Sequence, residues 1–318
     1  MKVVVTRPLP GDALKRLTGH ELDVHDFDTT GPTEGQLIEI ARDADALVTL
    51  LTDPVTEHVL DGCPKLKIVA QYAVGYDNVD LDAAQSRGIV VSHTPGVLTD
   101  ATADLAMALL LSAARRLLSA DRYVRDGRFR RWETDLLLGP DLHDGTIGIV
   151  GLGRIGAATA RRALGFGMEV IYHNRSPANP SIEQRLGARL VSMETLLEES
   201  DAVSLHCSLN PSTRHLIDGA ALERMKPTAI LVNTARGAVV DEEALVEALR
   251  TGEIASAGLD VFEDEPEVHP GLFELDNVVL APHLGSATHG ARRRMTEMCA
   301  EAIRAVFDGD EKIPHRVV

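Results

Sequence analysis

Residues 146–164 read TIGIVGLGRIGAATARRAL, an apolar run followed at once by a glycine-rich turn and an alanine-rich segment. The glycines follow the Gly-x-Gly-x-x-Gly spacing. The first allows a tight turn, the second lets the backbone approach a pyrophosphate, and the third lets helix and strand pack closely. Amides at the start of the helix attract the phosphates. We therefore predict a dinucleotide-binding strand, turn and helix. The predicted cofactor-binding residues of this loop are Gly151, Gly153, Arg154, Ile155 and Gly156.

The rest of the chain alternates short β-branched runs with segments of helical length, a pattern typical of parallel sheets with helical crossovers. Expected strands cover residues 2–6, 22–24, 46–50, 67–70 and 89–92, then 146–150, 169–172, 202–206, 229–233, 257–260 and 278–280. At 318 residues the chain exceeds the usual size of one hydrophobic core. We expect an α/β fold of two Rossmann-like or flavodoxin-like lobes with parallel sheets, a cleft between them and long helices linking them.

Two long helices are expected to join the lobes. Residues 100–120 are rich in alanine and leucine and contain neither glycine nor proline, so one continuous helix is predicted there. Residues 292–307 are again helical in composition and would return the chain to the first lobe. On this basis residues 1–98 and 289–318 form a discontinuous, flavodoxin-like substrate-binding domain. Residues 99–288 form a Rossmann dinucleotide-binding domain.

The composition argues against several classes of function. The formal net charge of −16 repels nucleic acids and anionic membranes, so neither is expected as a partner. No apolar stretch approaches the roughly 20 residues of a membrane span. The three cysteines lie far apart, which indicates small buried side chains rather than disulfides, and the histidines and acidic residues lack the compact spacing of a metal site. A cytoplasmic location is expected.

The end of the second strand of the dinucleotide unit bears on the choice of cofactor. NAD-binding versions carry an acidic residue about 20 residues after the glycines, where it binds the ribose 2′-hydroxyl. This chain has Asn174, Arg175 and Ser176 there. No carboxylate repels a 2′-phosphate, and Arg175 and Ser176 can donate hydrogen bonds to it, so NADP(H) is predicted to be preferred and NAD(H) possible. The alternative is that Arg175 is only a solvated charge.

Three later segments place polar side chains directly after apolar runs, at strand ends where open α/β sheets bind ligands. They are residues 233–237 (NTARG), 258–266 (GLDVFEDEP) and 281–287 (APHLGSA). With AVGYDNVD at 73–80 and TPGVLTDATAD at 94–104, the chain resembles the D-isomer-specific 2-hydroxyacid dehydrogenases over nearly its whole length. Within that family it is most similar to the glyoxylate and hydroxypyruvate reductases.

By this likeness Arg236 binds the substrate carboxylate and carbonyl, His283 is the acid and base, and Glu265 is its partner. Hydride transfer to a carbonyl carbon creates an alkoxide, so a proton donor must lie within hydrogen-bond distance of that oxygen. A carboxylate against the other ring nitrogen favours the protonated imidazole and fixes its orientation, and a planar guanidinium orients a carboxylate. Taken singly, Arg236 could be a surface charge, Glu265 a turn residue and His283 a loop histidine. Together the three residues favour a catalytic site.

The same likeness assigns the residues around this centre. It implies that the amides of Val74 and Gly75 hold the substrate carboxylate, with Leu51 lining the pocket, and that Asp260 faces the nicotinamide carboxamide. Beyond the glycine loop, the implied cofactor contacts are Asn174, Arg175, Ser176, Thr234, Ala235, Arg236, Asp260, His283 and Gly285. A homodimer built mainly on the cofactor domain is implied as well.

One departure from the glyoxylate and hydroxypyruvate reductases concerns residues 136–139 (LLLG), where close members often carry an aromatic side chain that reaches the neighbouring subunit's pocket. Trp132 either replaces it or packs at the dimer contact. We expect reduction of a small 2-oxo acid, glyoxylate or hydroxypyruvate, to the D-2-hydroxy acid. Two alternatives remain. One is a dehydrogenase working in the oxidative direction, against which the lack of an acid at Asn174 argues. The other is a non-catalytic dinucleotide sensor like the C-terminal-binding-protein corepressors.

Overall fold

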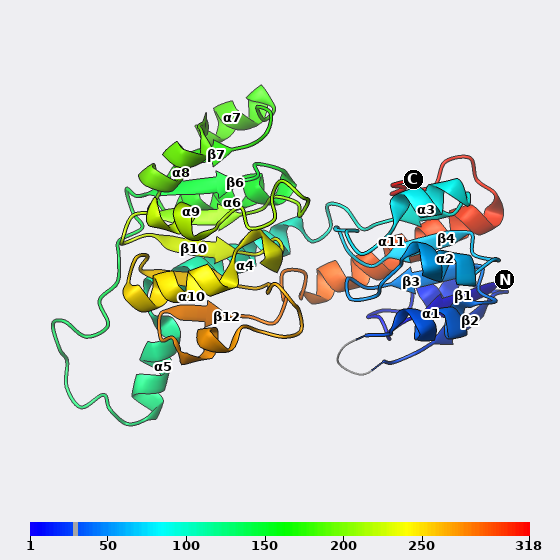
Figure 1. Ribbon diagram of the computed structural model, residues 1–318, viewed down its shortest axis with the longest axis horizontal. Helices are drawn as coiled ribbons and strands as arrows, with labels where there is room; N and C mark the ends of the chain where they lie inside the picture. Colours follow the sequence, from blue (N-terminus) through cyan, green and yellow to red (C-terminus); the bar gives the residue numbers. More distant parts are fainter. Residues whose placement is uncertain (28–30) are drawn as a thin grey trace. The chain divides into compact units, whose positions relative to one another are not determined.

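The computed structural model describes residues 1–27 and 31–318, which form two compact units (Figure 1). Unit 1 comprises Met1–Leu98 and Ala287–Val318, and unit 2 comprises Thr99–Ser286. The chain re-enters unit 1 two residues earlier than the sequence suggested. No helix in the described ranges is long and apolar enough to cross a lipid bilayer.

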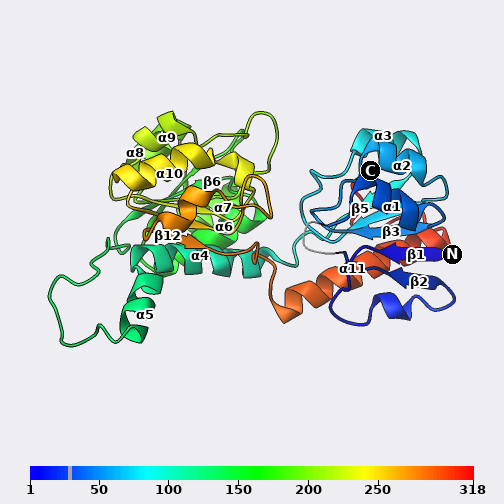
Figure 2. The same cartoon turned by 60° about the horizontal axis from the view of Figure 1, so that its bottom comes forward.

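Unit 1 contains a five-stranded parallel sheet in the order β2-β1-β3-β4-β5, which is the flavodoxin-like order. The strands are β1 (Lys2–Val5), β2 (Glu21–Val24), β3 (Ala46–Thr49), β4 (Ile68–Gln71) and β5 (Val90–Ser92). The helices are α1 (Glu34–Ala41), α2 (Glu57–Gly62), α3 (Leu81–Ser86) and α11 (His289–Asp308), with a 3-10 turn η1 (Leu14–Arg16). Figure 2 shows α1, α2 and α3 on one face of this sheet and α11 on the other. Both faces are thus covered, and β3 and β4 are buried throughout.

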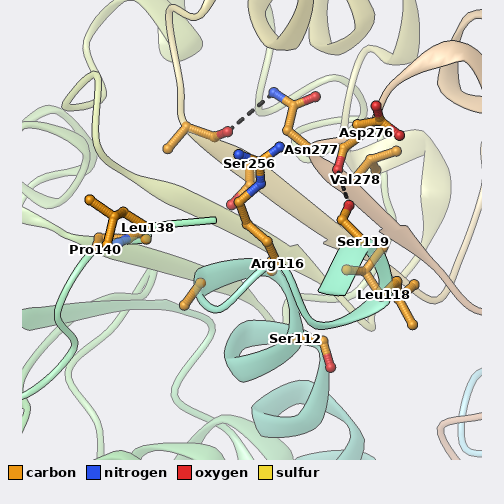
Figure 3. Close-up of a pocket in the computed structure, with 15 residues that line it drawn as sticks. Ser112, Arg116, Leu118, Ser119, Leu138, Pro140, Ser256, Asp276, Asn277 and Val278 are labelled. Atoms are coloured by element: carbon orange, nitrogen blue, oxygen red, sulfur yellow. Dashed lines mark hydrogen bonds between the residues drawn. The ribbon is translucent and has the colours of Figure 1, made fainter. Parts of the chain in front are cut away.

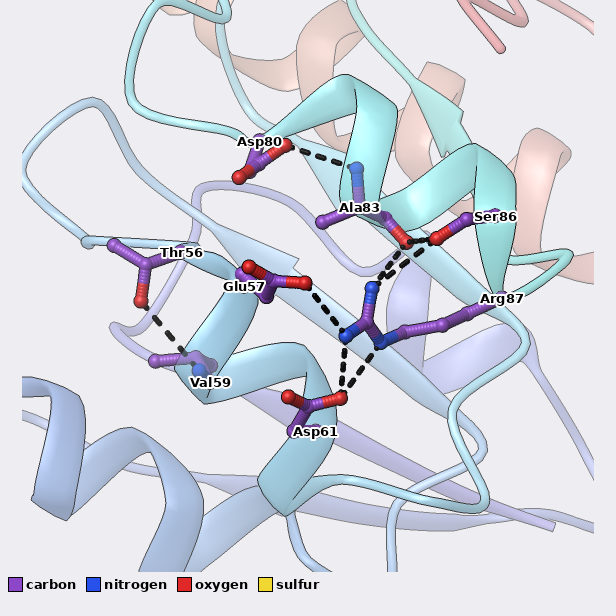
Figure 4. A network of polar contacts seen from close by, with 8 residues as sticks. All are labelled: Thr56, Glu57, Val59, Asp61, Asp80, Ala83, Ser86 and Arg87. Atoms are coloured by element: carbon purple, nitrogen blue, oxygen red, sulfur yellow. Dashed lines mark hydrogen bonds and ion pairs between the residues drawn. The ribbon is translucent and has the colours of Figure 1, made fainter.

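Polar side chains fix the helices at the edge of unit 1 (Figure 4). Thr56 and Asp80 cap the N-termini of α2 and α3, each accepting from the amide three residues ahead. Arg87, just after α3, ties the two helices together. Its Nε donates to Asp61 Oδ1 at 2.9 Å, and its Nη2 pairs with Glu57 Oε1 at 3.2 Å.

Unit 2 contains a seven-stranded parallel sheet in the order β12-β11-β10-β9-β6-β7-β8. The strands are β6 (Thr146–Val150), β7 (Glu169–His173), β8 (Arg189–Leu190), β9 (Ala202–Leu205), β10 (Ile230–Asn233), β11 (Ser256–Leu259) and β12 (Val278–Leu280). In chain order this is the Rossmann arrangement with an added edge strand, and the order reverses between β6 and β9. Ligands of such sheets bind at that reversal, beyond the carboxyl ends of the strands.

Helices cover both faces of this second sheet. They are α4 (Thr99–Ala114), α5 (Leu117–Arg125), α6 (Arg154–Gly165), α7 (Pro180–Leu186), α8 (Met193–Glu199), α9 (Gly219–Glu223) and α10 (Glu242–Thr251), with 3-10 turns η2 (Gly237–Val239) and η3 (Pro270–Glu274). Figure 2 shows α8, α9 and α10 on one side and α4 on the other. Two separate clusters of buried side chains fill the two interfaces. The predicted α/β architecture with two parallel sheets is confirmed.

The continuous helix predicted over residues 100–120 is wrong. The chain forms α4 and then α5, separated by Arg116 in the left-handed conformation with φ of 46°. Gly139 lies directly against the end of α4, where a Cβ would be 1.8 Å from the carbonyl oxygen of Ala114. The helix thus ends where a distant segment packs against it, a contact that helix propensity does not report. In both views α5 and the loop after it extend away from the sheet of unit 2 (Figures 1 and 2).

The three cysteines are free thiols. Cys63 and Cys299 are buried, as expected, but Cys207 is only partly buried because it follows β9 in a loop. Burial raises the pKa of the thiols of Cys63 and Cys207 to about 11 and that of Cys299 to about 12. All three are therefore protonated near neutral pH.

Candidate active site

The glycine loop after β6 has the geometry that its spacing predicts. Gly151 has φ of 95°, and a Cβ there would lie 2.7 Å from the amide nitrogen of Cys207. A Cβ on Gly156 would lie 2.2 Å from the carbonyl oxygen of Gly151. Gly153 differs, because no atom lies within 4 Å of its Cβ position. The first and third glycines thus permit close packing, and the second faces open space at the start of α6, where no side chain caps the helix.

The residues after β7 lie beside this loop. Asn174 Oδ1 accepts a hydrogen bond from the amide of Leu152 at 2.7 Å, so its carboxamide holds the glycine turn. Arg175 and Ser176 are exposed, and the Arg175 guanidinium makes no ion pair with any other described residue. Asn174, at the position where NAD-binding versions carry an acid, therefore has a structural role, and the donors Arg175 and Ser176 after it are open to solvent.

His206 directly follows β9, on the other side of the glycine loop. Its Nε2 lies 2.9 Å from Ser204 Oγ, and its buried Nδ1 has no hydrogen-bond partner within the described chain. Burial lowers the pKa of this imidazole to about 4. His206 is thus a neutral ring near pH 7, and its sequence position alone did not single it out.

His283 and Glu265, which the sequence predicted to be partners, lie in contact. His283 Nδ1 lies 2.7 Å from Glu265 Oε2, and the second carboxylate oxygen of Glu265 accepts from the amide of Phe262 at 3.0 Å. The two side chains are about 30% exposed, so both are accessible from solvent. Nε2 of His283 makes no hydrogen bond to another described residue. One ring nitrogen is therefore held by a carboxylate, and the other is available to a ligand.

Asp260 holds the turn that carries His283. Its two carboxylate oxygens accept from the amides of Leu284 at 2.6 Å and Gly285 at 2.8 Å, and its own carbonyl accepts from the amide of His283. Burial raises the pKa of this carboxyl group, which is 1% exposed. His283 itself has φ of 53°, a conformation uncommon for a non-glycine residue. The Asp260 bonds support that backbone, a role beyond the one inferred from resemblance.

Arg236 lies on the turn after β10. Asn233 fixes this turn, since its Oδ1 accepts from the amide of Ala235 at 3.0 Å and its Nδ2 donates to the carbonyl of Arg236 at 2.9 Å. A Cβ on Gly237 would lie 1.8 Å from the carbonyl carbon of Phe262. The arginine turn is therefore packed directly against the loop that carries Glu265. Neighbouring Thr234 has a buried Oγ1 with no hydrogen-bond partner among the described residues.

A further acidic residue holds the Glu265 loop, and the sequence reading missed it. Glu242, the first residue of α10, is 7% exposed, and its Oε1 accepts from the amide of Glu263 at 2.7 Å. Glu263 in turn accepts from Arg214 and lies 2.7 Å from His215 Nε2. The signal available in the sequence was an acid at a helix start, which is also an ordinary helix-capping pattern. Only packing shows what it holds.

The three predicted catalytic residues therefore lie in unit 2, after the neighbouring strands β10, β11 and β12. Leu51, Val74 and Gly75 lie in unit 1, after the neighbouring strands β3 and β4, and so at one edge of that sheet. Residues 1–27 and 31–318 contain no group of three or more histidine, cysteine or acidic side chains that could hold a metal ion.

Comparison with known proteins gives one family. The model of the D-isomer specific 2-hydroxyacid dehydrogenase NAD binding domain matches residues 107–285. The glyoxylate reductase of Thermococcus litoralis is 52% identical over 100% of this chain and 96% of its own length. A solved Thermus thermophilus protein is 48% identical with a TM-score of 0.93, and each chain is fully covered. An NADPH-dependent glyoxylate/hydroxypyruvate reductase of Sinorhizobium meliloti, solved with NADP and malonate, is 34% identical with a TM-score of 0.87, covering 100% of this chain and 96% of its own.

Proposed function

Because the chain belongs to the D-isomer specific 2-hydroxyacid dehydrogenase family, as its sequence indicated, we propose that it reduces short 2-oxo acids such as glyoxylate and hydroxypyruvate to D-2-hydroxy acids. It is an oxidoreductase that uses a nicotinamide dinucleotide. The observation that carries the proposal is the His283–Glu265 pair at 2.7 Å, on loops that Asp260 and the arginine turn hold at the carboxyl ends of the strands.

The residues of unit 2 fit this cofactor. The Cβ position of Gly153 faces open space, the start of α6 has no side-chain cap, and the hydroxyl of Thr234 is buried without a partner in the described chain. These groups supply amide and hydroxyl donors for a dinucleotide at the sheet's strand reversal. When bound, the reduced nicotinamide supplies a hydride to the substrate's carbonyl carbon.

The chain's own residues then supply orientation and a proton. Glu265 holds Nδ1 of His283, so Nε2 is the atom that donates a proton to the carbonyl oxygen as negative charge develops on it. The carboxylate of Glu265 offsets the positive charge of the protonated ring. Arg236 presents a guanidinium to the substrate carboxylate and carbonyl, which sets the carbonyl face that is attacked. For the substrate carboxylate we also propose the amides of Val74 and Gly75, with Leu51 beside them.

The test of this function is reduced-cofactor consumption against a panel of 2-oxo acids of increasing size. The panel contains glyoxylate, hydroxypyruvate, pyruvate, phenylpyruvate and 2-ketogluconate. We expect the smaller acids to give the higher kcat/KM, and His283→Ala to lower kcat by about 10²- to 10⁴-fold because the proton donor is lost. Preference for the largest acids would contradict the substrate assignment. Tight dinucleotide binding with no turnover of any acid would favour the sensor alternative.

A preference for NADP(H) over NAD(H) is part of the proposal. Its support is the exposed pair Arg175 and Ser176 together with the engagement of Asn174 in the glycine loop. We expect Arg175→Ala to raise KM for NADPH by roughly tenfold, the loss of one charge-assisted contact, and to leave KM for NADH unchanged. Equal effects of the substitution on both cofactors, or a wild-type preference for NADH, would refute the preference for NADP(H).

We also propose a cytoplasmic location, where these cofactors are held.

We also propose that the protein is a homodimer through the segment containing α5 and the loop after it. Six large apolar side chains of this segment are at least half exposed: Leu117, Leu118, Val124, Phe129, Trp132 and Leu138. At its base, a cavity of about 270 Å³ lies beside Arg116, Leu118 and Leu138, against the amino ends of β11 and β12 (Figure 3). So much exposed apolar surface in one segment is typical of an interface.

The dimer is tested by the mass of the wild type and of Phe129→Asp in analytical ultracentrifugation. We expect a dimer for the wild type and a shift toward the monomer for the variant, because a buried unpaired charge opposes association. Leu190→Asp is the matched control, since Leu190 is also exposed but lies on the edge strand β8. A monomeric wild type at micromolar concentration would contradict the proposal.

A further inference from the structure

Three consecutive peptide groups in unit 1 are held by their carbonyl oxygens. They lie between Ala73 and Tyr76, in the loop after β4. The amide of Thr94 donates to the carbonyl of Ala73 at 2.8 Å, His93 Nδ1 lies 2.9 Å from the carbonyl oxygen of Val74, and Gln71 Nε2 donates to that of Gly75 at 3.4 Å.

The amides of the same peptide groups have no such partner. In a trans peptide the N–H and the C=O point in opposite directions, so a bond that holds the carbonyl also sets the direction of the amide. The amides of Val74, Gly75 and Tyr76 therefore point away from the groups that bind the carbonyls. None of the three makes a hydrogen bond to another described residue, and all three residues are partly exposed. Successive amides arranged in this way attract an anion.

The donors that hold the carbonyls are themselves fixed. The His93 ring packs edge-on against Tyr76 at 5.4 Å between ring centroids, and the amide of His93 donates to the carbonyl of His315 at 3.1 Å. Gln71 is fully buried, with Oε1 accepting from Thr49 Oγ1 at 2.6 Å and Nε2 donating to Asn78 Oδ1 at 2.8 Å. The His93 ring cannot rotate without losing its contact with Tyr76, and the Gln71 side chain cannot rotate without breaking its two side-chain hydrogen bonds.

The same network reaches the loop that contains Leu51. Asn78 Nδ2 donates to the carbonyls of Leu50 at 3.0 Å and Asp53 at 2.8 Å. Asp53 is buried and accepts from the amide of Leu50 at 2.8 Å. The loops after β3 and β4 are thus held as one piece by the side chains of Gln71, Asn78 and Asp53.

We propose that His93 is a positioning residue, which orients the Gly75 amide for the carboxylate of the substrate by holding the Val74 carbonyl. The inference rests on the proposed function, because it takes the anion at these amides to be a 2-oxo acid. His93 does not contact the substrate and transfers no proton. Its contribution is to present a donor that needs no reorientation when the carboxylate binds. Gln71, through the Gly75 carbonyl, does the same for the next amide, that of Tyr76.

Two substitutions at one position separate the donor from the packing of the ring. His93→Asn keeps an N–H donor at the δ position, where Nδ1 lies in histidine, whereas His93→Leu has a similar branched shape and no donor. We expect His93→Leu to raise KM for glyoxylate and the inhibition constant of oxamate by roughly five- to tenfold, the worth of one hydrogen bond. We expect kcat, NADPH affinity and the melting temperature to be unchanged. His93→Asn is expected to behave as the wild type.

Equal values of KM and of the oxamate constant in His93→Leu and the wild type would overturn the proposal. So would equal losses in both variants, since these would assign the effect to the ring. A wild type that reduces no 2-oxo acid would instead overturn the proposed function. In that case the role of His93 is still tested by binding of oxamate to the NADPH complex, measured by fluorescence titration. Weaker oxamate binding by His93→Leu, with wild-type binding by His93→Asn, supports the role of His93. Absence of oxamate binding by the wild type refutes it.

Discussion

Replacing Gly237 by alanine tests whether the contact between the arginine turn and the Glu265 loop sets the geometry of the active site. The new Cβ would lie 1.8 Å from the carbonyl carbon and 1.9 Å from the carbonyl oxygen of Phe262. Ordinary contact begins at 3.4 Å, so the two loops must separate by about 1.6 Å, the difference between 3.4 and 1.8 Å. Backbone atoms form the obstacle, so no side-chain rotation relieves it.

A displacement of this size acts on Arg236 and on the Glu265–His283 pair together. Misplacement of catalytic groups by 1 Å costs about 100-fold in rate, and we expect at least that loss in kcat/KM for glyoxylate. NADPH binding, measured by fluorescence titration, is expected to weaken less than kcat/KM falls, because the glycine loop lies after a different strand and only the proposed cofactor contacts of the arginine turn itself are displaced. Gly219→Ala is the matched control, since only Ala244 Cβ, at 3.9 Å, lies near its Cβ position. A Gly237→Ala enzyme with wild-type kcat/KM would refute the reasoning.

Three further outcomes are expected. Burial lowers the pKa of His206 to about 4, so the unfolded state binds more protons below pH 6.5, and the free energy of unfolding falls between about pH 6.5 and pH 4. Between pH 7 and pH 5 the free energy of unfolding should fall by about 2 kcal/mol through this residue, and urea unfolding of His206→Gln should lack that contribution. If the difference in unfolding free energy between the wild type and the variant were the same at pH 7 and pH 5, the prediction would be wrong. Burial, complete for Cys63 and Cys299 and partial for Cys207, raises the pKa of all three thiols, so roughly 0.1% or less is thiolate at pH 8. The three thiols should therefore resist iodoacetamide in the folded protein and react after unfolding in urea. Rapid labelling of the native protein would be inconsistent with that burial. Glu242→Ala leaves the partly buried amide of Glu263 without its acceptor, so it should lower the free energy of unfolding by about 1 kcal/mol. It should also lower kcat more than NADPH affinity, and an unchanged kcat would show that the Glu265 loop keeps its conformation without Glu242.

Features encoded by residues adjacent in the chain could be predicted from the sequence. The apolar run before Gly151 and the glycine spacing specify a strand, a tight turn and a helix, because backbone conformation and strand burial depend on local residue types. Arg236, Glu265 and His283 could be named because each follows an apolar run at a strand end. The family resemblance supplied their roles, and the comparisons confirm the family.

Local composition was insufficient where a distant segment sets the conformation. The alanine- and leucine-rich run at 100–120 has the propensity of one helix, yet Gly139 lies against the end of α4 and the chain turns at Arg116. Helix propensity amounts to tenths of a kcal/mol per residue, so a single tertiary contact can override it. The two-residue strand β8 was likewise missed, because it is too short to carry a periodic pattern.

By itself, the sequence determined the α/β class, the position of the glycine-rich loop and the candidate residues that we propose for reduction of a 2-oxo acid. Only the tertiary structure decided which nitrogen of His283 meets Glu265, that Asp260 supports the histidine turn, and that His93 holds the Val74 carbonyl. These contacts join residues 18, 24 and 19 positions apart. Their direction is set by how neighbouring strands pack and where their loops end, which a linear pattern does not specify.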